Sequence, residues 1–198
     1  MKNKLQILLG GCLFFVFVAC QSPTEKPAAQ NQEEIDQRSG VWLSVLGTVQ
    51  DGGSPHIGCE KECCKDLFLR SNPELKVVSL GVIDYNNGKQ YLFDASPDFT
   101  TQVKYLSNQK DNFAGELPNG IFLTHAHIGH YTGLMYLGRE ALGADSVPVY
   151  AMPRMKSFLE NNGPWSQLVD LGNIVIQEMM ADSTVILSNQ LSVIPFCV

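Results

Sequence analysis

The chain has 198 residues, of which 44% are hydrophobic and 17% are charged, a composition that suits one globular domain and excludes a disordered chain. Fourteen lysines and arginines against 20 acidic residues give a formal net charge of -6, which argues against a nucleic-acid-binding surface. Six cysteines are too few for a small disulfide-stapled scaffold.

The N-terminal residues 1–19 predict a lipoprotein-type signal peptide. Lys2 and Lys4 precede an apolar run that ends at Cys20, and this run is shorter than the roughly 20 residues that a membrane-spanning helix needs. Residues 17–20, Phe-Val-Ala-Cys, resemble a bacterial lipobox, in which the cysteine becomes the lipidated first residue of the mature chain. An ordinary cleaved signal and an uncleaved anchor are the alternatives. We therefore expect an exported protein of the bacterial cell envelope that is attached to a membrane through a lipid on Cys20.

The rest of the sequence divides into a tether and one folded domain. Residues 20–38 are rich in glutamine, glutamate, proline and alanine, which cannot bury a core and predict a flexible tether. Over residues 41–198 strands and helices alternate in the middle with hairpin-like strands on either side, which predicts a layered mixed α/β domain. In chain order we expect strands at 41–48, 76–85 and 90–94, a helix at 96–106, a strand at 120–124, a helix at 133–142, a strand at 147–152, a helix at 154–161, and strands at 174–179, 184–187 and 191–196.

Local signals add detail to this map. Asn87 and Gly88 are expected to supply the positive-φ residues of a hairpin turn. Ser96 is expected to cap the following helix, with Pro97 in its first position. A glycine-rich loop over residues 50–58 leads to a further helix, which we expect near residues 62–70.

Three of the four histidines lie within six residues, at positions 125, 127 and 130. They follow a predicted buried strand, and the loop at the carboxyl end of a strand is where α/β sheets place their chemistry. In an extended backbone His125 and His127 point the same way, and His130 returns towards them from the first turn after the loop. This arrangement suits one or two divalent cations, with zinc preferred and iron or manganese as alternatives. The other interpretation is a set of half-exposed surface histidines.

Residues 124–134, Thr-His-Ala-His-Ile-Gly-His-Tyr-Thr-Gly-Leu, resemble the metal motif H-x-H-x-D-H of the metallo-β-lactamase superfamily, which is followed by a Gly-Leu helix start. Within that superfamily the chain is most similar to the coenzyme PQQ synthesis protein B family. The resemblance implies an αββα sandwich, of which the N-terminal half is present and the second half is incomplete. It covers essentially all of residues 41–198 and is also carried by residues 46–48, 52–55, Cys59, 94–98, 132–134 and 148–151.

The resemblance also implies roles for individual residues. His125 and His127 match the pair that holds the first metal, and His130 matches a ligand of the second. Asp94 matches an aspartate that supports the metal loop through its hydrogen bonds. The alternative for Asp94 is an ordinary turn residue at the end of a strand.

Two features depart from the motif. Gly129 stands where the motif has an aspartate that binds the second metal and orients the attacking water, so we expect a mononuclear site or a different water-orienting group, with Asp94 or Asp98 as candidates. No histidine follows His130, and two histidine ligands are fewer than the three protein ligands of an ordinary catalytic zinc site. Because the sequence also stops within a predicted strand, we expect it to be a piece of a longer chain.

A second candidate metal site lies in the first long loop. His56, Cys59, Cys63 and Cys64 occur within nine residues, and three thiols with an imidazole are a ligand set of structural zinc sites. A disulfide from Cys59 to Cys63 or Cys64 is the alternative in an oxidising compartment. Free or buried thiols are the third possibility.

The sequence and the resemblance together predict an exported metal-dependent hydrolase, in which a metal-activated water attacks an ester, a phosphodiester or an amide. A metal- or ligand-binding lipoprotein without catalysis is the first alternative, because Gly129 lacks the motif carboxylate. A metal-dependent oxidase resembling the coenzyme-synthesis proteins is the second. In each case the expected partners are a small molecule and, through Cys20, a membrane.

Overall fold

The structure, a computed structural model, describes residues 38–109 and 116–197. The predicted signal peptide, Cys20 and nearly all of the predicted tether therefore lie outside the described residues. Within the described ranges, no helix is both long enough and apolar enough to cross a lipid bilayer.

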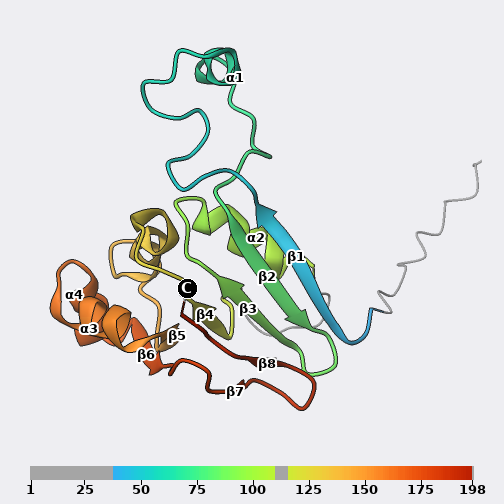
Figure 1. The fold of residues 1–198 in the computed structure, drawn as a ribbon, viewed down its shortest axis with the longest axis vertical. Coiled ribbons are helices and arrows are strands. Elements are labelled where there is room, and N and C mark those ends of the chain that lie inside the picture. Colours follow the sequence, from blue (N-terminus) through green and yellow to red (C-terminus); the bar gives the residue numbers. More distant parts are fainter. Residues whose placement is uncertain (1–37, 110–115, 198) are drawn as a thin grey trace, which may run out of the picture. The chain divides into compact units, whose positions relative to one another are not determined.

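Six strands form one mixed sheet in which neighbouring strands follow the order of the chain, β1 to β6 (Figure 1). β1, β2 and β3 pair antiparallel, whereas β3, β4, β5 and β6 pair parallel. A separate antiparallel pair consists of β7 and β8. The strands are β1 (Val41–Gly47), β2 (Ser79–Asp84), β3 (Lys89–Phe93), β4 (Gly120–Phe122), β5 (Val147–Ala151), β6 (Ile174–Glu178), β7 (Val185–Ile186) and β8 (Ser192–Val193).

The helices are short. The α-helices are α1 (Glu62–Lys65), α2 (Phe99–Ser107), α3 (Pro153–Asn161) and α4 (Trp165–Asp170), and 3₁₀ helices occur at Asp66–Phe68, Ile128–His130 and Thr132–Leu137. α2 packs on β1, and α3 and α4 pack on β6. Figure 1 shows α1 on the long connection between β1 and β2.

The central sheet buries side chains on both faces. On one face Ile83 and Leu92 pack with residues of α2, α3 and α4 in the larger core cluster. Their chain neighbours Val82 and Tyr91 point to the other face and belong to a second cluster, against which the residues of β7 and β8 pack. This alternation follows from the two-residue period of a strand. Helices therefore cover one face and a small second sheet covers the other, which confirms the predicted layered mixed α/β fold.

All eight predicted strands are present, most of them shorter than predicted. The predicted helix at 154–161 is confirmed as α3, and α4 is an additional helix. The helix predicted at 62–70 is divided into α1 and a 3₁₀ turn that ends at Phe68.

The prediction that Ser96 caps the following helix is wrong. α2 begins at Phe99, and Asp98 occupies the cap position without a side-chain hydrogen bond to the helix. Ser96 is fully buried instead. Its hydroxyl donates to Oε1 of Gln102 at 2.7 Å and accepts the amide hydrogen of Asp98 at 3.0 Å. Ser96 therefore connects the segment before α2 to Gln102, a fully buried residue of that helix.

Two further local predictions need correction. Gly88 has a φ of 62°, but Asn87 is not among the described residues with positive φ. Asn87 holds the turn in another way, because its side chain donates to Oδ2 of Asp84 at 2.8 Å. The helix predicted at 133–142 is a 3₁₀ helix that ends at Leu137. Its second residue, Gly133, donates its amide hydrogen to the carbonyl of Ala95 at 2.8 Å, a partner outside the helix.

Candidate metal centre

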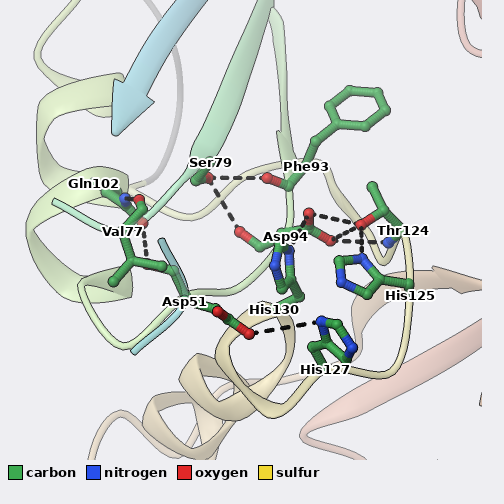
Figure 2. A network of polar contacts seen from close by, with 11 residues as sticks. Asp51, Val77, Ser79, Phe93, Asp94, Gln102, Thr124, His125, His127 and His130 are labelled. Atoms are coloured by element: carbon green, nitrogen blue, oxygen red, sulfur yellow. Dashed lines mark hydrogen bonds and ion pairs between the residues drawn. The ribbon is translucent and has the colours of Figure 1, made fainter. Parts of the chain in front are cut away.

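The loop after β4 brings the three clustered histidines together. The ring centroid of His125 lies 4.6 Å from that of His127 and 4.0 Å from that of His130. His125 and His127 are exposed, whereas His130 is buried. Figure 2 shows the three rings with Asp94 and Asp51 beside them. The structure thus places the predicted ligands side by side at the carboxyl end of a parallel strand.

Asp94 fixes the position of His130. Its Oδ2 lies 2.8 Å from Nδ1 of the imidazole, and both side chains are buried. Asp94 has a φ of 68°, a left-handed conformation that aspartate tolerates better than most residues. Because Nδ1 of His130 is engaged by a carboxylate, its Nε2 is left for another partner.

Thr124 connects the same carboxylate to His125. The amide of Thr124 donates to Oδ1 of Asp94 at 2.8 Å, and its hydroxyl lies 3.0 and 2.8 Å from the two carboxylate oxygens. The hydroxyl also lies 2.9 Å from Nδ1 of His125. A hydroxyl has one hydrogen to donate, and an ionised carboxylate only accepts. Nδ1 of His125 is therefore the donor to Thr124, and its Nε2 carries the lone pair that a cation needs.

The environment also favours the neutral form of His125. Partial desolvation, followed by the nearby His130 and His127, holds the pKa of His125 below its ordinary value, against smaller opposite effects of Asp94 and Asp51. Neutral imidazole is the form that binds metal ions.

Asp51 also lies at the site, although no motif in the sequence marks it. Its Oδ2 is 3.7 Å from Nδ1 of His127, and a dashed line marks this contact in Figure 2. The signal that points to it is topological. Because β1 and β2, and β2 and β3, pair antiparallel, β1 runs in the same direction as β3. The residues after β1 therefore reach the same edge of the sheet as Asp94.

Asp98, the other predicted water-orienting candidate, has a different partner. Its Oδ2 accepts the amide hydrogen of Val77 at 2.8 Å, which joins the start of α2 to the chain before β2. No described contact connects Asp98 to the histidines, so the structure gives it a role in holding the chain together.

The cysteine loop forms a second cluster. The sulfur atoms of Cys59, Cys63 and Cys64 all lie within 4.8 Å of one another, and no other described group of three or more histidine, cysteine or acidic side chains is as close. His56 is outside this set: it is exposed, and its Nδ1 contacts the carbonyl of Ile57 at 2.9 Å. A hydrogen bond with Cys64 lowers the pKa of the Cys59 thiol and raises that of Cys64. The described cysteines are all free thiols.

Comparison with known proteins identifies the family. Residues 89–197, more than half of the chain, match the family model described as a beta-lactamase superfamily domain. The chain belongs to the metallo-β-lactamase superfamily. The resemblance seen in residues 124–134 is thereby confirmed, and the described layers agree with the αββα sandwich of this superfamily.

Two solved structures share the metallo-β-lactamase fold with this chain. Zn²⁺-bound PqqB from Methylobacterium extorquens is 21% identical, with a TM-score of 0.61, over 79% of this chain and 55% of that one. A diphosphatase from the PhnP family is 25% identical, with a TM-score of 0.52, over 74% of this chain and 53% of that one. The chain therefore spans about half the length of both. Comparison with curated proteins gave no match.

Proposed function

We propose that this chain carries the metal-binding half of an exported, lipid-anchored metal-dependent hydrolase, with a divalent cation on His125, His127 and His130. The observation that carries the proposal is that hydrogen bonds orient the rings of His130 and His125. Nδ1 of His130 is held by Asp94 and Nδ1 of His125 by Thr124. Both Nε2 atoms are left for a metal ion.

The donor set fits a divalent cation in its chemistry. Neutral imidazoles are preferred zinc ligands, and a second hydrogen-bonded nitrogen is the usual way in which their orientation is fixed. The ligand atoms of the three histidines do not all lie within 4.8 Å of one another, unlike those of the described cysteine cluster. The side chain of His127 is 75% exposed, and its Nδ1 faces the carboxylate of Asp51 at 3.7 Å.

A divalent cation on these ligands would lower the pKa of a water molecule and polarise an ester, phosphodiester or amide oxygen. Zinc is the first metal to test, because the similar PqqB structure holds Zn²⁺, and iron and manganese are the alternatives. Diphosphates and phosphodiesters are the first substrates to test, because the similar PhnP-family protein is a diphosphatase.

The test is metal analysis of the purified full chain together with a His125→Ala/His127→Ala variant. We expect the double variant to lose one metal equivalent while the circular dichroism spectrum stays unchanged. The control is His56→Ala, which removes the histidine that the structure leaves outside both clusters. A double variant that retains all of its metal would refute the site. If a screen of phosphodiesters, lactones and β-lactams shows no metal-dependent turnover, the proposed hydrolase activity is refuted.

A second candidate function is metal or ligand binding without catalysis. Gly129 favours it, because this position carries no ligand atom where the motif has a carboxylate. It predicts tight metal binding that depends on the same histidines but no turnover of any substrate in the screen.

A further inference from the structure

Asp51 fills the space that a side chain at position 129 would need. A Cβ atom built on Gly129 would lie 2.4 Å from Cβ of Asp51, 2.6 Å from its carbonyl oxygen and 2.9 Å from its Cα. Carbon atoms that are not bonded to each other pack at about 3.5 to 4.0 Å, so no side chain fits at position 129 while Asp51 keeps this place. Glycine is therefore the residue that fits at position 129 beside Asp51.

The residue that fills this space brings a carboxylate with it. Oδ2 of Asp51 is 3.7 Å from Nδ1 of His127, which is too long for a direct hydrogen bond. Two ligands of one tetrahedral zinc ion, each bound at about 2.1 Å, are separated by about 3.4 Å. The observed separation of the two atoms is therefore close to that of two ligands that share one cation.

The turn that carries Asp51 is held at several points. The side chain of Gln50 accepts the amide hydrogen of Gly52 at 2.8 Å and donates to the carbonyl of Gly53 at 2.9 Å. Just before it, Val49 donates to the carbonyl of Lys76 at 2.9 Å, next to the start of the β2 strand. The carboxylate is thus presented from a turn that is fixed to the sheet rather than from an unsupported loop.

We propose that Asp51, from the turn after β1, supplies a carboxylate ligand to the cation of the three histidines, in place of the aspartate that the superfamily motif carries at position 129. The inference rests on the proposed metal site of the three histidines. It explains how the chain can keep the histidines of the motif and lack its aspartate. The carboxylate reaches the same place from a different element. The chain then provides three imidazoles and one carboxylate at this edge of the sheet.

The test compares Asp51→Asn with the parent in the full chain. Asparagine keeps the size and packing of the side chain and removes the anionic ligand. After removal of metal, Zn²⁺ is titrated in competition with a chromophoric chelator. We expect Asp51→Asn to lose one zinc equivalent or to bind it at least about 10-fold more weakly. The matched control is Asp170→Asn, which removes an exposed carboxylate at the end of α4 and should bind zinc as the parent does.

Loading with Co²⁺ separates this site from the cysteine cluster. Asp51→Asn should change the ligand-field bands of the bound cobalt and leave any thiolate-to-cobalt charge-transfer bands unchanged. The same bands report directly on the ligands, so the result does not depend on finding a substrate.

A position swap provides the second variant. Gly129→Asp alone should lower the melting temperature, because its Cβ meets Asp51. In Asp51→Gly/Gly129→Asp the shortest contact is gone, although the two backbone contacts still require the turn to shift. We expect this double variant to bind more zinc than Asp51→Asn, because it restores a carboxylate from the motif position.

The outcomes separate the two proposals. Zinc affinity and cobalt spectra of Asp51→Asn that equal those of the parent would overturn the role of Asp51 and leave the histidine site intact. A parent chain without any metal that depends on His125 and His127 would overturn both. If Asp51→Asn does not fold, the swap decides: a folded swap variant that binds no more zinc than His125→Ala/His127→Ala overturns the inference.

Discussion

Asp94 and His130 form a buried pair in which Oδ2 of the carboxylate lies 2.8 Å from Nδ1 of the imidazole, with 9% and 11% of the two side chains exposed. A buried carboxylate is costly unless it is hydrogen-bonded, and here Thr124 supplies further donors from its amide and hydroxyl. The backbone is joined as well, because Ala95 donates to the carbonyl of His130 at 2.9 Å. The loop with the histidines is thus anchored to the end of β3.

We predict that Asp94→Asn weakens Zn²⁺ binding at the histidines by about 10- to 100-fold. It should also lower the free energy of unfolding by about 1 to 3 kcal/mol, because a charge-assisted buried hydrogen bond is lost. Asparagine tolerates the left-handed backbone of this position, so the loss reports on the charge. Zinc titration and urea unfolding measure the two effects.

Asp98→Asn is the matched control for this prediction. The Asp98 carboxylate binds the amide of Val77 and does not contact the histidines among the described residues. The Asp98→Asn variant should be less stable than the parent and should bind zinc with the same affinity. Equal zinc affinities for Asp94→Asn and the parent would contradict the supporting role of Asp94.

The second prediction concerns pH and the small sheet. Asp84 is buried at the end of β2 and accepts a hydrogen bond from the Ser188 hydroxyl at 2.6 Å, which connects it to the β7–β8 pair. Burial raises the pKa of Asp84, but the hydrogen bonds from Ser188 and Asn87 outweigh it and hold the pKa below its ordinary value. The folded pKa is therefore the lower one, so this stabilisation is present above the unfolded pKa and is lost as the pH falls through the folded pKa.

Ser188→Ala should lower the free energy of unfolding at pH 7 by about 1.5 to 3 kcal/mol, the usual range for a hydrogen bond to a charged group. The difference from the parent should shrink as the pH falls below about 4, where an ordinary aspartate becomes protonated. Urea unfolding at several pH values measures it. Ser183→Ala, an exposed serine in the turn before β7, is the control. A difference that stays constant down to pH 2 would show that Asp84 is not the partner that matters.

The third prediction concerns Cys20, which lies outside the described residues. In cells grown with a labelled fatty acid, the parent chain should carry the label and Cys20→Ala should not. Cys12→Ala is the matched control, because it removes a cysteine of the same segment and should leave labelling intact. Equal labelling of the parent and Cys20→Ala would remove the proposed lipid anchor.

The strands and the histidine cluster could be predicted from the sequence because their signals are local. Apolar runs on either side of the Asn87-Gly88 turn mark β2 and β3, and the spacing of His125, His127 and His130 after a strand needs no knowledge of the fold. The family resemblance predicts Asp94, and the structure shows its contact with His130.

What could not be predicted depends on contacts between distant parts of the chain. Asp51 reaches the site because β1 and β3 run in the same direction, which follows only once the pairing of both with β2 is known. Asp94 and Asp98 both follow β3, and only the contact with Val77 shows that Asp98 serves another purpose. Gly133, at the start of the 3₁₀ helix after the histidines, likewise donates to Ala95, a contact between distant residues that no local pattern marks.

The last prediction concerns the cysteine cluster. Since the sulfur atoms of Cys59, Cys63 and Cys64 lie within 4.8 Å of one another, a bound Zn²⁺ would hold them as thiolates and protect them from thiol reagents. Cys197 is exposed and outside the cluster. In the zinc-loaded protein we expect Cys197 to react rapidly with a disulfide reagent and the three clustered thiols to react only after a chelator is added.

The alternatives give different titrations. A disulfide between Cys59 and Cys63 or Cys64 would release two thiols with a reductant but none with a chelator. Free thiols would react without either, with the exposed Cys63 ahead of the buried Cys64. Cys197→Ser should remove only the rapid phase. His56→Ala should leave the protection unchanged, because its ring is not part of the set; if protection is lost, His56 is the fourth ligand and its exposed position changes when the metal binds.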